Sequence, residues 1–298
     1  VPVNDPILLV SAMAAVTERL GFGVTIASTY EHPYSLARTL TTLDHFTGGR
    51  GGWNVVTSYL NSAARNLGLG DQIAHDDRYG IADEFLDVTY KLWEGSWEDG
   101  AAVRDREAGV FTDPEKVHPI RHHGTHFDVP GIHLGEPSPQ RTPVIFQAGA
   151  SPRGQEFAAR HGEAIFINGL TPELTRRTTD SIRDKAAAIG RPRDSVKILT
   201  LATVIVAETD ELAQEKYADY RSYVSLEGAL ALYGGWSGID LSTLDPDEPL
   251  TYVDTDAARS ALSIFTKADP TRAWTPRDIA EYVGIGGIGA VIVGSPTT

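Results

Sequence analysis

Apolar residues recur along the chain with two spacings, which predict alternating helices and strands. Spacings of three and four residues predict five helices, over 6–20, 34–46, 75–93, from about 152, and over 171–190. Nearly continuous apolar runs predict five buried strands, over 23–29, 51–58, 142–151, 163–169 and 196–209. Strand and helix follow each other about five times. We therefore predict an α/β fold whose parallel strands are joined by helical crossovers.

The same spacing predicts which side of a helix is buried and where a helix begins. In the first helix the inward stripe is Leu9, Ala12, Met13, Val16 and Leu20. In the helix over 75–93 it is Ala82, Phe85, Leu86, Thr89 and Leu92. Asp5, Ser151 and Thr171 each precede a proline, which predicts a helix cap followed by proline in the first turn.

Two segments, about 95–141 and 225–275, interrupt this rhythm. Both contain glycine, proline and charged residues, and both are too long for ordinary connections, so we expect lids or subdomains. A closed barrel of parallel strands needs eight strands, whereas five are predicted here. Either strands have been missed or they lie outside this chain. We treat residues 1–298 as one partial domain that carries these two insertions.

Composition excludes several classes of partner. The formal net charge of −14, from 40 acidic and 26 basic residues, disfavours nucleic acids and anionic membranes, which attract lysine and arginine. The absence of cysteine excludes disulfides and thiolate metal sites. No apolar run approaches the roughly 20 residues that a membrane span needs. We expect a cytoplasmic protein with neither nucleic acid nor membrane as a partner.

The stretch TGGRGGWNVVTS, residues 47–58, is rich in glycine. A Walker phosphate loop would need lysine followed by serine or threonine, and a dinucleotide fingerprint would place its glycines after a strand. Neither pattern is present, so we predict a tight turn and then a strand that ends near Thr57 and Ser58. In parallel barrels this end of the strand is the reactive edge. Asn54 either serves a site there or only satisfies backbone groups, and the spacing leaves both open.

Two further motifs are candidates for anion binding. In HDDRYGIADEF, His75 and Tyr79 are four residues apart and share one helix face near its positive end. They bind an anion or a polar cofactor chain, or they are simply solvated or packed. In QAGASPRG, small residues precede Ser151, which begins a helix. The N–H groups of that first turn suit a phosphate, and the alternative is an ordinary helix cap.

Five histidines lie close together in the first long segment: His118, His122, His123, His126 and His133. A metal site needs its ligands fixed on rigid elements with supporting hydrogen bonds. These histidines have neither helical nor strand spacing. We expect solvated loop histidines, or one that reaches over a substrate, and no metal site.

Five motifs occur in a defined order: HPYSLARTLTTLDHFTGGRGGWNVVTS, AARNLG, HDDRYGIADEF, QAGASPRG and GGWSGIDLSTLDPDEPL. In this order the chain resembles the flavin-dependent monooxygenases typified by nitrilotriacetate monooxygenase and dibenzothiophene-sulfone monooxygenase, within the bacterial-luciferase-like superfamily. The resemblance extends from about Asp5 to Pro296. It implies a luciferase-like TIM-type (β/α) barrel that binds FMN at the carboxyl ends of its strands.

The resemblance also implies site residues. Carried over by position, the FMN contacts fall on Ser28, His75, Tyr79 and Ser151, with Asn54 beside the flavin ring. Many relatives have threonine at the position of Ser28, which keeps the hydroxyl. The resemblance leaves the catalytic residues unassigned. His32, His45 and His126 are the candidate bases.

The resemblance implies partners as well. A separate NAD(P)H-dependent flavin reductase would supply reduced FMN, and molecular oxygen would oxidise a small substrate: an aminopolycarboxylate, an organosulfur compound or an alkyl compound. Such barrels often form dimers or tetramers. Members of this family begin with a further strand, helix and strand and continue after VGSP, so we expect a barrel truncated at both ends. The alternatives are a deazaflavin-dependent oxidoreductase on the same fold, a metal-dependent barrel hydrolase and an inactive fragment.

Overall fold

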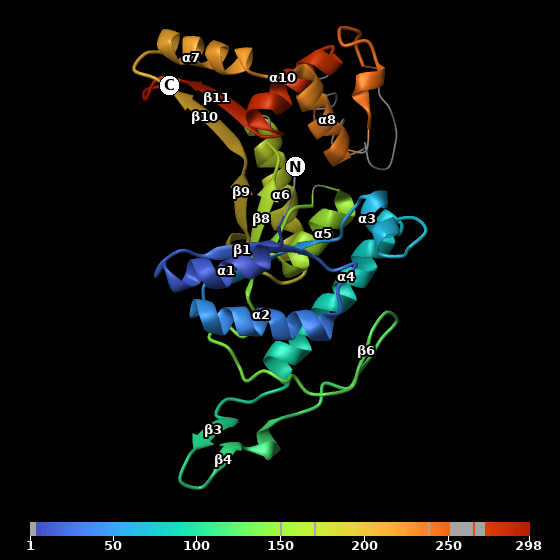
Figure 1. The fold of residues 1–298 in the computed structure, drawn as a ribbon, viewed down its shortest axis with the longest axis vertical. Coiled ribbons are helices and arrows are strands. Elements are labelled where there is room, and N and C mark those ends of the chain that lie inside the picture. Colours follow the sequence, from blue (N-terminus) through green and yellow to red (C-terminus); the bar gives the residue numbers. More distant parts are fainter. Residues whose placement is uncertain (1–3, 150, 170, 238, 251–264, 266–271) are drawn as a thin grey trace. The chain divides into compact units, whose positions relative to one another are not determined.

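The structure is a computed structural model that describes residues 4–149, 151–169, 171–237, 239–250, 265 and 272–298 (Figure 1). The chain divides into two compact units. The first comprises Val1–Ala148 and His161–Ala164, and the second comprises Gly149–Arg160 and Ile165–Thr298. The single domain expected over residues 1–298 stays a prediction.

Three parallel strands form the sheet of the first unit: β1 (Phe22–Ala27), β2 (Gly51–Val56) and β7 (Val144–Gln147). Their register places Thr25, Asn54 and Phe146 side by side in one row. The three strands were predicted, and each is shorter than its apolar run. Parallel pairing of strands that are far apart in sequence confirms the helical crossovers expected between them.

The glycines of residues 47–58 perform two tasks. Gly48 and Gly49 have φ angles of 61° and 83°, a left-handed conformation that ends the preceding helix and makes the predicted tight turn. Gly52 lies on β2, where an added Cβ would come within 2.7 Å of the Phe146 ring. A side chain at this position would therefore displace the ring from the sheet.

Helices cover one face of this sheet. They are α2 (Pro33–Thr47) and α4 (His75–Tyr90), and a π-helical turn, η1 (Lys91–Gly95), continues α4. Trp53 is fully buried against Phe85 of α4, with ring centroids 5.7 Å apart. The predicted inward residues of α4 are all buried, as are Leu36, Leu40 and Leu43 of α2.

The opposite face of the sheet is open, which corrects the prediction that both faces of the strands are covered. Gly23 and Thr25 are exposed, whereas Asn54, Val144 and Phe146 are half-buried. Burial therefore alternates along β1 and β2, so that Val24 and Val55 lie inside.

The first helix differs from its prediction. Asp5 caps α1 (Pro6–Ala15) as expected, by accepting a hydrogen bond from the N–H of Ile7 at 3.0 Å. The helix ends five residues before Leu20, and only Val10 is buried. The predicted inward stripe is exposed, from 40% for Met13 to 83% for Val16. The helix α1 carries apolar residues on all of its sides. The spacing alone therefore could not identify which side is buried, and the predicted face is wrong.

The segment over 95–141 is less irregular than expected. It follows α4 and η1, while a short helix, α3 (Asn61–Asn66), precedes α4. Strands β3 (Ala102–Asp105) and β4 (Val110–Thr112) form one antiparallel hairpin, followed by η2 (Pro114–Lys116). Strands β5 (His122–His123) and β6 (Asp128–Val129) form another. Figure 1 shows the β3–β4 hairpin extending away from α2.

The second unit begins with the helix α5 (Pro152–His161), followed by β8 (Ala164–Ile167), α6 (Pro172–Ala188), η3 (Arg193–Ser195) and β9 (Lys197–Thr200). Strand β8 neighbours β9. Thr171 caps α6 as predicted, by accepting from the N–H of Leu174. The side chains of Ile165, Ile167, Ile182 and Val196 form the core between these elements.

The single strand predicted over 196–209 is wrong, because the chain forms two strands there. After β9, the strand β10 (Ala202–Val206) pairs in parallel with β11 (Ala290–Gly294), which the apolar pattern missed. Leu201 separates β9 from β10, and its carbonyl accepts from the N–H of Ala290. Gly289 lies so close to Leu201 that a Cβ would come within 2.7 Å of its side chain. At this contact the chain leaves the sheet that contains β9 and enters the sheet formed by β10 and β11.

The helices α7 (Asp210–Ser222), α8 (Leu226–Ser237) and α10 (Pro276–Gly286) and the turn η4 (Leu241–Thr243) complete the second unit. Tyr233, Phe265, Trp274 and Tyr282 form an aromatic cluster between α8 and α10. The predicted insertion over 225–275 therefore contains α8 and part of this core. Its residues 251–264 and 266–271 lie outside the described residues.

The packing of Phe85 provides a stability test. Phe85→Ala should lower the free energy of unfolding by about 3–5 kcal/mol, because it leaves a cavity beside Trp53. Phe46→Ala is the control: Phe46 is 67% exposed, and its loss should cost at most about 0.5 kcal/mol. Urea denaturation followed by tryptophan fluorescence measures both. Equal losses in the two variants would contradict the packing described here.

Candidate functional site

The carboxyl ends of β1 and β2 are joined by hydroxyl groups. Ser28 is fully buried, and both its N–H and its hydroxyl donate to the carbonyl of Val56, at 3.0 and 3.3 Å. The hydroxyl of Thr29 donates to the carbonyl of Thr57 at 2.7 Å. Ser28 thus holds the two strand ends together, and its hydroxyl oxygen retains lone pairs that accept further hydrogen bonds.

Asn54 lies on the open face of the sheet with half of its amide satisfied. Its Nδ2 donates to the hydroxyl of Thr25 at 2.9 Å. Its Oδ1 is buried and has no hydrogen-bond partner within the described part of the chain. A buried carbonyl oxygen without a donor costs free energy, so it marks a place where a ligand N–H or O–H would be stabilising.

His75 and Tyr79 share one face at the start of α4, as predicted. Their ring centroids are 5.2 Å apart. Tyr79 is 6% exposed, whereas the side chain of His75 is 43% exposed and its Nδ1 lies 2.6 Å from Asp76. No side chain caps this helix start, because residue 74 is alanine.

Arg78 stands between them in the sequence, and the motif analysis did not select it. It is 7% exposed, and its Nη1 donates to the carbonyl of Ile73. Its Nε has no partner among the described residues. One feature of the sequence could have identified Arg78. It is a basic residue in the first turns of a helix, where the helix dipole makes basic residues unfavourable.

Ser151 caps the helix α5 of the second unit. Its Oγ accepts from the N–H of Gly154 at 3.0 Å, and its carbonyl accepts from the N–H of Gln155 at 2.8 Å. The ordinary cap foreseen as the alternative is therefore present. Its role toward a phosphate stays a prediction. Ser28, Asn54, His75 and Tyr79 belong to the first unit and Ser151 to the second.

A half-buried carboxylate fixes the β5–β6 turn against α4. Glu84 accepts hydrogen bonds from the N–H groups of Thr125, His126 and Phe127 at 2.9–3.1 Å. Its side chain is 15% exposed. A Cβ on Gly124 would collide with the carboxylate, so glycine is required there. Backbone N–H groups that converge on one carboxylate make a rigid anchor.

His122 completes this anchor from the other side. Its Nε2 lies 3.2 Å from Glu84, and Nζ of Lys91 lies 3.0 Å from its Nδ1. The ammonium group can only donate, so this geometry fits the tautomer with the proton on Nε2. Burial raises the pKa of Glu84, but hydrogen bonds from Phe127, His122 and His126 outweigh it and hold the pKa below its usual value of 4.5.

The anchored turn places Phe127 against the start of α2 and against α4. Phe127 packs edge-on against His32, which caps α2, and against Phe85, with centroid distances of 5.9 and 5.6 Å. His126 is exposed beside it. Two of the candidate bases, His32 and His126, thus flank Phe127.

The prediction of solvated histidines is wrong for two of the five. His122 and His133 are 6% and 2% exposed, because each is hydrogen-bonded inside the first unit. At the surface, Nε2 of His118 lies 2.7 Å from Glu98, and Nδ1 of His123 lies 2.8 Å from Asp128. Within the part of the chain that the structure describes, His, Asp and Glu side chains form no group arranged to hold a metal ion.

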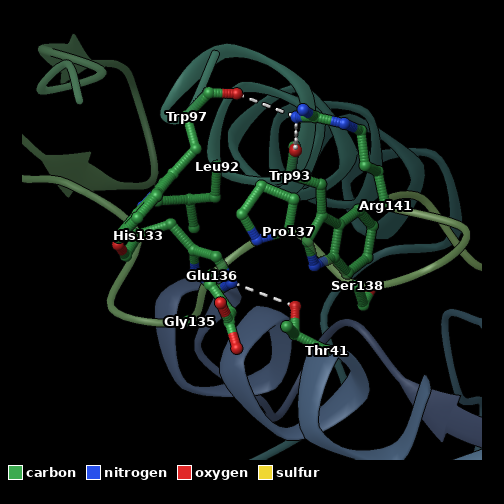
Figure 2. Close-up of a pocket in the computed structure, with 10 residues that line it drawn as sticks. All are labelled: Thr41, Leu92, Trp93, Trp97, His133, Gly135, Glu136, Pro137, Ser138 and Arg141. Atoms are coloured by element: carbon green, nitrogen blue, oxygen red, sulfur yellow. Dashed lines mark hydrogen bonds between the residues drawn. The ribbon is translucent and has the colours of Figure 1, made fainter. Parts of the chain in front are cut away.

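His133 lines a small pocket between α2, η1 and the segment over 133–141 (Figure 2). Its Nε2 lies 3.0 Å from the hydroxyl of Thr41, and its carbonyl accepts from the indole of Trp97. Nδ1 of His133 and Oγ of Ser138 are buried without partners among the described residues. Desolvation lowers the pKa of His133 to about 4, so the ring is neutral at pH 7.

Residues 2–273 match the family described as luciferase-like monooxygenase. The chain belongs to this family. It is 58% identical over 296 residues to dimethyl-sulfide monooxygenase of Hyphomicrobium sulfonivorans, covering 99% of this chain and 62% of that protein. It is 48% identical over 309 residues to long-chain alkane monooxygenase of Geobacillus thermodenitrificans, covering 100% and 70%.

Solved structures to which the chain is similar agree with the fold. The crystal structure of DmoA from Hyphomicrobium sulfonivorans has a TM-score of 0.88 at 57% identity and covers 100% of this chain and 63% of that one. A riboflavin lyase solved with modified FMN and riboflavin has a TM-score of 0.87 at 38% identity, covering 100% and 65%. The predicted luciferase-like TIM-type α/β fold is confirmed. The chain spans less than two thirds of the length of these two proteins.

No helix within the described ranges combines the length and the apolar character needed to cross a membrane.

The Glu84 anchor makes a prediction for local stability. Glu84→Gln should raise amide hydrogen exchange at residues 125–127 by about tenfold or more, because charge-assisted hydrogen bonds become neutral ones. The control is Glu107→Gln on the exposed β3–β4 turn. The folded-state pKa of Glu84 is depressed, so protection in the wild type should persist above about pH 4.5 and weaken as the pH falls below it. Unchanged exchange in Glu84→Gln would rule out the anchor.

His133 makes a prediction for global stability. Its folded-state pKa is depressed, so the unfolded chain binds a proton first as the pH falls from 6.5 toward 4. The wild type should lose on the order of 3 kcal/mol of unfolding free energy across this range through His133. His133→Asn should lose less than the wild type, whereas His123→Gln, at an exposed position, should follow the wild type. Urea denaturation at several pH values measures the free energy of unfolding of all three proteins. If that free energy falls with pH by the same amount in all three, His133 does not have this role.

Proposed function

We propose that this chain is the oxygenating part of a two-component flavin-dependent monooxygenase. The observation that carries the proposal is the family match over residues 2–273, together with relatives at 58% and 48% identity that are named monooxygenases. The reductase would be a separate protein that supplies reduced FMN, and molecular oxygen would be the co-substrate. The chain itself would bind the cofactor, orient the substrate and exclude water.

The residues of the first unit fit a flat, polar and anionic cofactor. Asn54 has an orphaned acceptor oxygen on the open sheet face, beside the Phe146 ring. A flavin ring carries N–H donors for such an oxygen and an apolar face for such a ring. The start of α4 offers the phenol of Tyr79, the imidazole of His75 and a buried guanidinium.

Each candidate residue has a role in this proposal. Asn54 would receive a hydrogen bond from the flavin ring, while Ser28 would hold the strand ends beneath it. His75 and Tyr79 would bind the phosphate or the ribityl chain. In the second unit, Ser151 keeps the first turn of α5 in place, whose N–H groups would receive a phosphate. Reduced FMN, when bound, supplies the electrons that activate oxygen.

Water must be kept from this chemistry. The Glu84-anchored turn places Phe127 next to His32 at the start of α2. An apolar ring held there by three backbone N–H groups that donate to one carboxylate is a suitable fixed wall. We infer that the segment over 95–141 contributes to the cover through this turn.

We infer that the substrate is a small organic compound with an oxidisable sulfur or carbon atom. The relatives are named for dimethyl sulfide, long-chain alkanes, dibenzothiophene sulfone and nitrilotriacetate, which share no charge or shape. A homo-oligomer, dimer or tetramer, is part of the same proposal. The second candidate, a deazaflavin-dependent oxidoreductase, would transfer hydride and consume no oxygen.

Oxygen consumption tests the proposal directly. The chain is mixed with FMN, a flavin reductase, NADH and dimethyl sulfide or an alkane, and an oxygen electrode records uptake. Free reduced flavin converts oxygen to hydrogen peroxide, and catalase added to duplicate samples returns half of the oxygen consumed in this way, so that the difference between duplicates measures this background. Substrate-dependent uptake that catalase does not reverse would support a monooxygenase. Saturable FMN binding without any such uptake would count against it.

The start of α5 makes a prediction for cofactor binding. Ser151→Asp should weaken FMN binding by about tenfold or more, because a carboxylate replaces the hydroxyl beside the incoming phosphate. Aspartate is itself a good helix cap, so α5 should remain intact. Thr171→Asp is the matched control, since Thr171 caps α6 in the same way. Quenching of flavin fluorescence measures both, and equal affinities in the two variants would exclude Ser151 from the phosphate site.

A further inference from the structure

Large apolar and aromatic side chains gather at the surface just after β2 ends. Tyr59 and Leu60 lie between this strand and α3, while Leu67 and Leu69 follow α3, and all four are 37–57% exposed. Exposed apolar residues that occur singly are ordinary, whereas four within a short segment beside a candidate site indicate a contact surface. We call residues 59–69 the rim.

Hydrogen bonds hold the rim at the carboxyl ends of β1 and β2. The N–H of Gln72 donates to Oδ1 of Asn61 at 3.0 Å, which ties the two ends of the rim together. The side chain of Gln72 donates to the phenol oxygen of Tyr30, which follows β1, at 2.6 Å. Ser58 precedes the rim with a φ of 55°, a left-handed conformation that is unfavourable for a residue with a Cβ. Backbone strain of this kind is concentrated at functional sites.

The rim carries no net excess of positive charge, and exposed carboxylates surround it. The only charged side chains within residues 57–74 are Arg65 and Asp71, and Nη2 of the first lies 3.3 Å from Oδ1 of the second. The exposed charged residues that follow β1 and begin α4 are acidic: Glu31, Asp76 and Asp77. Within residues 57–74 the surface therefore offers a substrate apolar contact area and no unpaired cation.

We propose that the rim selects an uncharged, apolar substrate, with Tyr59 and Leu60 in contact with it. The proposal rests on the proposed function, because it takes the carboxyl ends of β1 and β2 as the site of the reaction. An apolar substrate gains free energy when it and the rim side chains leave water together. A polycarboxylate would lose hydration without gaining a cation, and it would approach exposed carboxylates. The rim thus favours alkyl sulfides and alkanes over aminopolycarboxylates.

Two substrates that differ in one group test this selection. Methyl propyl sulfide and 3-(methylthio)propanoate have the same chain length, but the second ends in a carboxylate where the first ends in a methyl group. Oxygen uptake with FMN, a flavin reductase, NADH and catalase gives kcat and KM for each. The wild type should favour the uncharged sulfide in kcat/KM by about 100-fold or more. Equal values, or a preference for the carboxylate, would overturn the proposal.

Substitutions locate the selection on the rim. Tyr59→Ser and Leu60→Ser should each raise the KM for methyl propyl sulfide by about five- to tenfold and change kcat less, because they remove apolar contact with the bound substrate. Leu60→Arg should shift the ratio of kcat/KM values toward the carboxylate by about tenfold or more, which loss of structure alone would not do. Val103→Ser is the control, since Val103 is 46% exposed on the β3–β4 hairpin and should leave both substrates unchanged. An unchanged ratio in Leu60→Arg would exclude the rim from substrate selection.

Binding without turnover separates this proposal from the proposed function. Saturation-transfer NMR on protein mixed with oxidised FMN shows which of the two sulfides binds, whether or not oxygen is consumed. Selective binding of methyl propyl sulfide that Leu60→Arg weakens would support the role of the rim even without oxygen uptake, and in that case only the proposed reaction fails. Binding of both sulfides alike, or of neither, would overturn the role of the rim.

Discussion

The packing of α4 against the sheet is the constraint on which the first unit depends. Trp53 and Phe85 are fully buried against each other, and Ala82, Leu86 and Thr89 fill the same interface. This contact fixes the rotation of a helix whose other faces carry the polar chemistry. His75, Arg78 and Tyr79 lie in its first turns, and Glu84 lies one turn before Val88 and Thr89. If the apolar face of α4 packed less tightly against the sheet, the helix could not hold these groups in a defined direction.

Two charged side chains on α4, the half-buried Glu84 and the buried Arg78, differ in how their charge is compensated. Glu84 accepts from three backbone N–H groups and lies beside His122, so its negative charge is stabilised within the protein. Arg78, six residues earlier, has one carbonyl and no carboxylate in the described part of the chain. A compensated charge stabilises the fold that surrounds it. An uncompensated one raises the free energy of the empty protein and is relieved when an anion binds.

The sequence predicted the elements well wherever one apolar face was distinct, and it failed where that distinction was absent. The stripes of α2 and α4 were correct because polar residues occupy their other sides. The stripe of α1 was wrong because Leu8 and Val10 are as apolar as Leu9. The strand over 196–209 was wrong because an apolar run does not record a change of pairing partner at Leu201. The shared face of His75 and Tyr79 followed from spacing, whereas the role of Glu84 depends on tertiary hydrogen bonds that span up to 43 residues.

The glycine-rich stretch before β2 connects these observations to the open sheet face. With no Cβ at Gly52, the ring of Phe146 can lie across β1 and β2, close to both Gly23 and Gly52. Asn54 follows two residues later on the same face, in register with Thr25 and Phe146. The hydroxyl of Thr25 accepts a hydrogen bond from Nδ2 of Asn54. The amide oxygen of Asn54 is therefore the atom that has no hydrogen-bond partner among the described residues. An aromatic ring and an oriented acceptor thus lie side by side on parallel strands, which is the arrangement that the proposed function uses for a flat ring with N–H groups at its edge, and no phosphate loop is needed to explain those glycines.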